Sequence, residues 1–248
     1  MYRNELENYL NQLLDISRFR DYCPNGLQVE GRNEIHTVIS GVTASLDLLH
    51  AAAAAKADAV LVHHGYFWRG ENERITGIKR HRIALLIAHD MNLFAYHLPL
   101  DTHQELGNNT QLGRKLGFIE TNRFGEQNIV VQGKLMRPIT LGDLGAKISK
   151  KLSRDPLIIG ETDKPIRHVA WCTGAAQSYF DEAIHRGVDA FITGEISEQT
   201  VHAARESGAA FIAAGHHATE RYGVQALGEH IAQKFGVNHQ FIDIDNPV

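Results

Sequence analysis

Cysteine is nearly absent from this chain, since Cys23 and Cys172 are the only two among 248 residues and they lie far apart. No CxxC spacing occurs, which argues against a thiolate metal site and favours a reducing, cytoplasmic location. No apolar run reaches the length of a membrane span, and the charged, amphipathic start MYRNELENYLNQLL is unlike a secretory signal. We therefore expect a cytoplasmic protein that does not interact with a membrane.

Proline is also scarce, with 6 residues, and the only low-complexity stretch is residues 51–55. The sequence therefore shows no long linker or disordered tail. The net charge of −4 gives no support for tight nucleic-acid binding, although it leaves that partner open because a basic surface can be hidden in an acidic chain. Histidine, in contrast, is abundant, with 15 residues. Metal binding is the first hypothesis for this excess, and surface positions are the alternative.

A strand–helix–strand pattern occurs twice along the chain, after an amphipathic helix at 5–14. The first copy has strands at 36–42 and 58–63 around a helix at 46–56, and the second has strands at 168–173 and 189–193 around a helix at 178–186. Val38 matches Val169 and Asp58 matches Asp189, both at a separation of 131 residues. We predict an α/β fold of two similar, internally duplicated lobes, 1–124 and 125–248, with a metal site between them at the carboxyl ends of strands.

A second correspondence concerns polar residues that follow short apolar strands. "LFAYHLPLD" places His97 four residues before Asp101, and "FIAAGHHATE" places His216 four residues before Glu220, at a separation of 119 residues. The first copy therefore carries roughly 12 additional residues between its strands, and 69–80 is the expected place for them. A histidine four residues before a carboxylate at the start of a helix puts both side chains on one face.

These residues, together with the pair His63 and His64, all fall at the carboxyl ends of predicted strands, where ligands of α/β sheets bind. The spacing suggests a two-metal site in which His63 and Asp101 hold one ion, His64 and His216 hold the other, and Glu220 bridges them. Adjacent histidines at the end of a strand can reach two ions because the chain bends out of the sheet there. Two neighbouring ions can jointly activate a water and polarise a substrate oxygen.

Other polar and aromatic residues have simpler interpretations. Glu195 stands where the first copy has His64, and it either supports the site or caps the next helix. His217 lacks the four-residue spacing and is left out. The aromatic residues 66–68 are expected in the core rather than under a base, and the basic residues 79–82 on a solvated face rather than at a phosphate. The remaining histidines considered are interpreted as surface or hydrogen-bonded residues: His81, His89, His103, His185, His202, His230 and His239.

Five segments resemble the YbgI-like family, also named GTP cyclohydrolase type-two homologues or Nif-three-like proteins: "PNGLQVEG" (24–31), "VHHGYFW" (62–68), "HLPLD" (97–101), "TGEISEQT" (193–200) and "AGHHATE" (214–220). The likeness covers the whole chain in the same order. It implies a dinuclear metal centre and a ring-shaped, toroidal homohexamer. Carried over by position, the implied metal ligands are His63, His64, Asp101, His216 and Glu220, which is the set that the spacing suggests.

The resemblance also implies a hydrolase that acts on a nucleotide or related small molecule, such as one that opens the guanine ring of GTP with loss of formate. Two divalent ions per subunit are expected, and the ligands suit zinc, iron, manganese, cobalt or nickel. His97 is the candidate catalytic residue, as a proton shuttle or substrate donor; it could instead be a sixth ligand or orient Asp101. The alternative function is a non-catalytic, metal-binding ring that serves as a scaffold for a protein or nucleic-acid partner.

Overall fold

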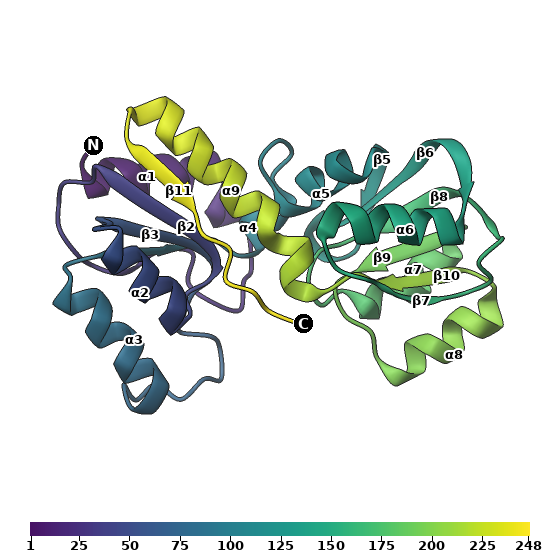
Figure 1. Ribbon diagram of the computed structural model, residues 1–248, viewed down its shortest axis with the longest axis horizontal. Helices are drawn as coiled ribbons and strands as arrows, with labels where there is room; N and C mark the ends of the chain where they lie inside the picture. The colour runs from purple at the N-terminus through teal and green to yellow at the C-terminus, as the bar shows by residue number, and fades with distance from the viewer. The chain divides into compact units, whose positions relative to one another are not determined.

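The computed structural model describes residues 1–248, and the chain forms two compact α/β units (Figure 1). The first unit contains Met1–Gly107 and Gly223–Asp245, and the second contains Asn108–Tyr222 and Asn246–Val248. This division differs from the expected consecutive lobes 1–124 and 125–248. Two strand pairings account for the difference, because residues 118–124 pair within the second sheet and residues 238–241 return to the first sheet.

Five strands form the sheet of the first unit: β1 (Gly26–Val29), β2 (Thr37–Thr43), β3 (Ala59–His64), β4 (Asn92–Ala95) and β11 (Asn238–Phe241). Their order is β1-β4-β3-β2-β11. The four strands from β4 to β11 are parallel, and β1 pairs antiparallel with β4 at one edge. The strands expected at 36–42 and 58–63 are therefore confirmed.

The helices of the first unit are α1 (Arg3–Leu13), η1 (Ile16–Arg18), α2 (Leu46–Ala54), α3 (Gly77–Ala88), α4 (Leu98–Thr102) and the part of α9 (His216–Phe235) that follows Tyr222. The start of α2 has a clear local cause. Ser45 precedes it, and its Oγ accepts a hydrogen bond from the backbone N–H of Leu48 at 3.3 Å. Such a cap stabilises a helix by about 1 kcal/mol.

Alternation along β3 places apolar side chains on both faces of the sheet. Val60 and Val62 pack with α2 and α3, whereas Ala59 and Leu61 pack with α1 and α9. Successive side chains of a strand point to opposite faces, so a strand buried on both sides is apolar without interruption. This explains the run that precedes the two histidines, and it fixes the direction in which the end of β3 projects.

Six strands form the sheet of the second unit: β5 (Phe118–Phe124), β6 (Val130–Thr140), β7 (Leu157–Ile159), β8 (Pro165–Trp171), β9 (Ala190–Thr193) and β10 (Ala210–Ala213). Their order is β5-β6-β8-β9-β10-β7, with β8, β9 and β10 parallel. The helices and short turns of this unit are α5 (Asn108–Leu116), η2 (Glu126–Asn128), α6 (Leu141–Leu152), η3 (Gln177–Tyr179), α7 (Phe180–His185), α8 (Glu198–Ser207) and the start of α9.

The predicted duplication is visible in the strand register. β2 pairs with β3 so that Val38 lies opposite Ala59, and β8 pairs with β9 so that Val169 lies opposite Ala190. The loop carboxylates repeat as well. Oδ2 of Asp58 accepts hydrogen bonds from the backbone N–H groups of residues 36 and 37, and Oδ2 of Asp189 accepts them from residues 167 and 168. The two copies therefore share hydrogen bonds as well as a sequence pattern.

The copies differ in the segments that follow their strands. Residues 65–76 separate β3 from α3, whereas residues 194–197 separate β9 from α8, so most of the additional length follows the histidine pair as expected. The second copy has one extra residue before its histidine, because Ala214 and Gly215 lie between β10 and His216 while only Tyr96 lies between β4 and His97. Gly215 adopts a φ of +96°, a conformation that glycine accommodates without a Cβ clash. No helix of the structure combines the length and apolar character needed to cross a membrane.

Candidate metal centre

The carboxyl ends of β3 and β4 bring an imidazole and a carboxylate together in the first unit. His63 is fully buried, and its Nδ1 lies 2.9 Å from the carbonyl oxygen of Tyr96, directly after β4. Because a carbonyl can only accept, Nδ1 carries a proton, and neutral His63 keeps its lone pair on Nε2. This Nε2 lies 3.4 Å from Oδ1 of Asp101, a buried residue of α4. An imidazole lone pair beside a carboxylate suits a divalent cation.

The two adjacent histidines of β3 lie close together despite the alternation of strand side chains. The ring centroids of His63 and His64 are 4.6 Å apart with an interplanar angle of 47°. β3 ends at His64, so its side chain is not held to the regular pleat. Nδ1 of His64 lies 3.1 Å from Oγ1 of Thr43, the last residue of β2. Possible ligand atoms of His63, His64 and His97 lie within 4.8 Å of one another, close enough for one cation or two adjacent ones.

His97 is held by a carboxylate that the sequence analysis did not single out. Its Nδ1 lies 2.7 Å from Oδ1 of Asp21, and the edge of its ring meets Trp68 at a centroid distance of 4.9 Å. Cys23 also lies near this pair. Burial, together with the charge of Asp21, raises the pKa of the Cys23 thiol to about 12.

A second histidine–carboxylate group lies at the carboxyl ends of β9 and β10 in the second unit. His216 begins α9, and its Nε2 lies 3.2 Å from Oε2 of the buried Glu220 one turn later. Its Nδ1 lies 2.7 Å from Oε1 of Glu195, which therefore supports the histidine rather than capping a helix. Burial alone would lower the pKa of His216, but the hydrogen bonds and negative charges of Glu220 and Glu195 raise it to about 9.

A glycine makes room for this second group. Gly174, in the loop after β8, has a φ of +69°, and a Cβ at this position would lie 2.2 Å from Oε1 of Glu220 and 3.2 Å from Nε2 of His216. The loop is held in place because the N–H of Gly174 donates to Oγ1 of Thr219 at 3.1 Å. Because Gly174 has no side chain, its backbone can lie directly against the carboxylate of Glu220.

One property unites the four histidines of these groups. In each, Nδ1 contacts a protein oxygen: the Tyr96 carbonyl for His63, the Thr43 hydroxyl for His64, the Asp21 carboxylate for His97 and the Glu195 carboxylate for His216. This arrangement leaves Nε2 of each ring as the nitrogen for metal binding or proton transfer. Metal-binding histidines usually donate their other ring N–H to a carboxylate or carbonyl, which fixes the ring and its tautomer. The residues of both units thus fit divalent cations.

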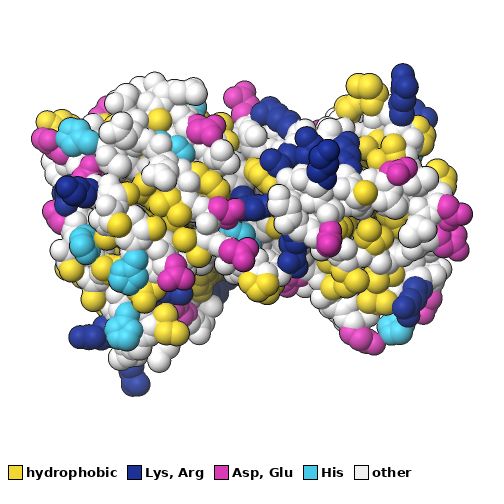
Figure 2. Space-filling model, viewed as in Figure 1, with side chains coloured by type: hydrophobic (Ala, Val, Ile, Leu, Met, Phe, Trp, Pro, Cys, Tyr) yellow, Lys and Arg dark blue, Asp and Glu magenta, His cyan; other side chains and the backbone are white.

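The other histidines have the ordinary environments that the sequence suggested. His81, His89, His185 and His202 are exposed, and Figure 2 shows histidines scattered singly over the visible surface. His230 and His239 are half-buried and contact the hydroxyls of Tyr9 and Ser40, at 2.5 Å and 2.8 Å. His103 accepts the N–H of Leu106 at 3.0 Å. None of these histidines belongs to a group of three or more side chains that could hold a metal ion together.

The flanking aromatic residues follow the simpler interpretation only in part, because Phe67 is 38% exposed and therefore does not lie in the core as expected. Tyr66 is buried, and its hydroxyl donates to the carbonyl of Ala44 at 2.8 Å. Lys79 makes an ion pair with Glu71 at 3.3 Å, and its side chain is only 9% exposed, so it does not lie on the solvated face that was expected. Neither residue is arranged to hold a base or a phosphate, whereas Trp68 does lie against His97.

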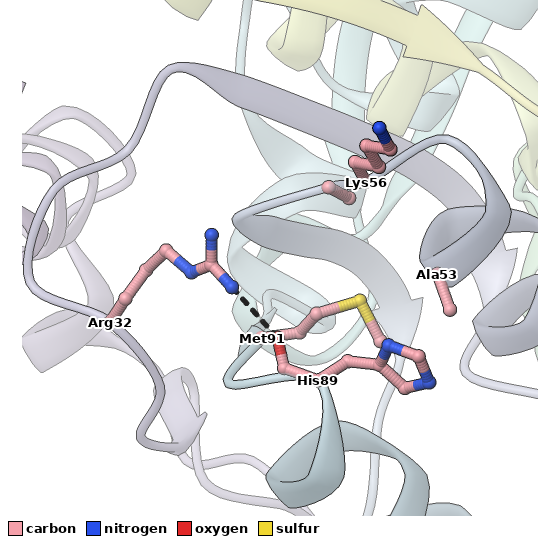
Figure 3. Close-up of a pocket in the computed structure, with 6 residues that line it drawn as sticks. Arg32, Ala53, Lys56, His89 and Met91 are labelled. Atoms are coloured by element: carbon pink, nitrogen blue, oxygen red, sulfur yellow. Dashed lines mark hydrogen bonds between the residues drawn. The ribbon is translucent and has the colours of Figure 1, made fainter.

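A cavity of about 240 Å³ in the first unit lies away from the ligand groups (Figure 3). It is lined by Arg32, Ala53, Lys56, Ala57, His89 and Met91. Arg32 directs its donors to the protein, contacting the Asp58 carboxylate at 3.0 Å and the carbonyl of His89 at 3.0 Å. Asp58 and Met91 precede β3 and β4, so the cavity lies at the amino ends of these strands. Because Arg32 spends its donors on neighbouring protein groups, we interpret the cavity as a packing gap rather than a ligand site.

The fold and the two histidine–carboxylate groups define the class of protein. It is an internally duplicated α/β protein with groups of histidine and carboxylate side chains that could hold metal ions.

The family follows from comparison with known proteins. The chain belongs to the family described as Duf34/NIF3 (NGG1p interacting factor 3), which matches residues 1–247. A GTP cyclohydrolase 1 type 2 homolog from Pseudomonas aeruginosa is 55% identical over 240 residues, which cover 96% of this chain and 95% of the relative. One from Allochromatium vinosum is 51% identical over 244 residues, covering 98% and 96%. The family expected from the sequence motifs is confirmed.

Solved structures agree with this assignment. The structure of protein ybgI, described as of unknown function, superposes with a TM-score of 0.97 at 49% identity and covers all of both chains. TTHA1606 from Thermus thermophilus has a TM-score of 0.91 at 32% identity, again over all of both chains. The α/β fold expected from the sequence is therefore confirmed.

Proposed function

We propose that the protein is a metal-dependent hydrolase of a nucleotide or a related small molecule. The observation that carries this proposal is the common orientation of four histidines, each with Nδ1 on a protein oxygen and Nε2 presented for binding or proton transfer. The proposed ligands of two divalent ions are His63, His64, Asp101, His216 and Glu220.

The proposed chemistry divides between the ions and the side chains. Divalent ions supply Lewis acidity and lower the pKa of water, and their identity is open among zinc, iron, manganese, cobalt and nickel. Glu195 and the Tyr96 carbonyl orient ligand imidazoles through Nδ1. His97 first takes up a proton on the lone pair of Nε2 and then delivers it to the leaving group, because its Nδ1 is already engaged by Asp21 and Nε2 lies on the opposite side of the ring.

The nucleotide class of the substrate rests on the relatives. Several relatives with half of their residues identical carry the name GTP cyclohydrolase 1 type 2 homolog. GTP and modified nucleotides are therefore the first compounds to test, with formate release as the specific sign of ring opening. A fold shared with relatives does not determine a substrate, so a panel of nucleotides is needed.

The decisive experiment combines metal content with turnover. Protein purified without chelator should contain two divalent ions per subunit by elemental analysis. Glu220→Gln should lower the affinity for both ions if this carboxylate bridges them, whereas loss of one ion would identify a terminal ligand. Glu229→Gln is the matched control, because Glu229 lies on the same helix, is exposed and accepts a hydrogen bond from Gln225. Two retained ions in Glu220→Gln would contradict the assignment of Glu220.

We also propose that the protein forms a ring-shaped homohexamer in the cytoplasm, as the family resemblance implies. If the metal-loaded hexamer hydrolyses no nucleotide in the panel and every metal position is filled by protein atoms, the enzyme proposal fails. The metal then has the structural role of the alternative scaffold function. A salt series of nucleic-acid binding measurements tests that scaffold for phosphate contacts.

A further inference from the structure

Asp21 is a buried carboxylate that lies beside the candidate site and contacts His97. It lies between η1 and β1, and its side chain is only 3% exposed. Besides the ring of His97, it contacts the backbone after β4, because Oδ2 accepts the N–H of Leu98 at 3.0 Å. The loop that carries Asp21 is therefore joined to the segment between β4 and α4.

The hydrogen bonds of Asp21 determine the proton position on His97. Oδ1 accepts from the N–H of Tyr22 at 2.6 Å and lies 2.7 Å from Nδ1 of His97. Oδ2 accepts from Leu98 N and from Nδ2 of Asn25 at 2.8 Å. An ionised carboxylate has about four lone-pair sites and no donor, so all four contacts must come from N–H groups. His97 therefore has its proton on Nδ1.

The carboxylate stays ionised in this environment. Burial would raise the pKa of Asp21, but the hydrogen bond and charge of His97, followed by the bonds from Asn25 and Tyr22, lower it to about 2. The backbone of His97 is fixed as well, since its N–H donates to Oδ1 of Asn25 at 2.7 Å. The ring consequently has little freedom to turn Nδ1 away from Asp21.

The second unit reaches the same arrangement by another route. His216 occupies the position of His97 in the duplicated pattern, and its Nδ1 also meets a carboxylate at 2.7 Å. That carboxylate, Glu195, is at the position where the first copy has His64, so the duplication leaves no acid in that place beside His97. Asp21 comes from a segment outside the repeated pattern. Two unrelated chain segments thus supply a carboxylate to equivalent histidines, which indicates that the site requires it.

We propose that Asp21 is a positioning residue that holds His97 in the Nδ1–H tautomer and thereby keeps the lone pair of Nε2 on the side of the ring opposite Asp21. The ring centroid of His97 lies 5.0 Å from that of His63 and 5.8 Å from that of His64, so Nε2 is the nitrogen available at the candidate centre. The functional meaning rests on the proposed role of His97 in proton transfer, whereas the tautomer itself does not.

Asp21→Asn gives a specific test because of the geometry around the carboxylate. If the new amide group faces the partners of Oδ2, it confronts two donors, Leu98 N–H and the Asn25 amide. If the amide group faces the partners of Oδ1, the backbone N–H of the exposed Tyr22 loses its acceptor. His97 stays paired in this orientation if its proton moves to Nε2, because Nδ1 can then accept a hydrogen bond from the amide group. The second orientation leaves fewer donors unsatisfied, and we therefore expect the tautomer of His97 to reverse.

The measurement is a ¹⁵N solid-state spectrum of the zinc-loaded full chain labelled at histidine, with the His97 signals assigned by their absence in His97→Asn. We expect protonated Nδ1 in the wild type, protonated Nε2 in Asp21→Asn, and no change in Asp15→Asn. Asp15 is the matched control because it is nearby in sequence and its carboxylate contacts only the hydroxyl of Ser17, at 3.3 Å.

A wild-type spectrum with protonated Nε2 would overturn the proposal, and so would an Asp21→Asn spectrum identical to the wild type. The wild-type spectrum is decisive even if Asp21→Asn does not fold. Turnover is measured separately. If the wild type hydrolyses a nucleotide, Asp21→Asn should lose at least about a hundredfold in rate while keeping its metal. Absence of any hydrolysis would reject the proposed function and leave the tautomer assignment intact.

Discussion

Gly174→Ala should disturb the ligand group of the second unit by a predictable amount. The added Cβ would lie 2.2 Å from Oε1 of Glu220. The backbone cannot withdraw, because the N–H of Gly174 donates to Oγ1 of Thr219 at 3.1 Å and its carbonyl accepts the N–H of Gly194 at 2.8 Å. The Glu220 carboxylate must therefore move by roughly 1.3 Å to restore an ordinary contact of about 3.5 Å.

Such a movement is large on the scale of metal coordination, where ligand distances are held within about 0.2 Å. We expect the metal affinity of Gly174→Ala to fall by about 10- to 100-fold, the range typical for loss of support to a ligand. The left-handed backbone adds a separate destabilisation of about 1–2 kcal/mol, because alanine is strained there. In a chain of this size each kcal/mol lowers Tm by roughly 2–4 °C.

Gly187→Ala is the matched control for the backbone term. Gly187 belongs to the same unit, its φ is +71°, and a Cβ there would have no neighbour within 4 Å. Both variants should lose thermal stability, but only Gly174→Ala should lose metal affinity in calorimetric titrations. Unchanged metal affinity in Gly174→Ala would refute the reasoning that a collision displaces Glu220. Equal losses of affinity would show that general loosening, rather than the collision, weakens the site.

Three further predictions follow from the site and the family. His97→Asn should retain both ions and lose at least about a hundredfold in turnover, measured on one preparation; lost metal would make His97 a ligand. In chelator-treated protein, the stability that His216 contributes relative to His216→Asn should be full below pH 6.5 and be lost as pH rises through about 9, because its folded pKa is raised; zinc saturation should abolish this trend in thermal melts. Light scattering should give about six times 27.6 kDa, and a monomer mass would contradict the hexamer.

The strands that precede the candidate ligands could be predicted from the sequence because their signal is local. An apolar run buried on both sheet faces followed by polar residues indicates a parallel strand that ends at a site. The duplication strengthened this interpretation, since Val38 and Val169 occupy equal registers in the two sheets. The four-residue spacing of His216 and Glu220 likewise predicted a contact on one helix turn, which the structure has at 3.2 Å.

The supporting residues could not be predicted in this way. Asp21 lies 76 residues before His97, in a loop whose composition is that of an ordinary turn. Its neighbour Asn25 belongs to the PNGLQVEG segment, which was the only available hint. The boundaries of the two units could not be predicted either, because they depend on the parallel pairing of His239 with Val38, about 200 residues apart. Contacts between residues so far apart in the sequence form only in the assembled sheet, and they produce no periodic pattern in the sequence.

The number of proposed ligands favours catalysis over a purely structural metal site. The first unit offers His63, His64 and Asp101, and the second offers His216 and Glu220. If both ions are zinc and Glu220 is shared in the proposed arrangement, these five side chains would fill about six of about eight positions. His97 leaves this count unchanged in the proposed role, because Asp21 engages one nitrogen and proton transfer needs the other. About two positions then stay available to solvent or substrate, and open positions distinguish catalytic metal centres from closed structural ones.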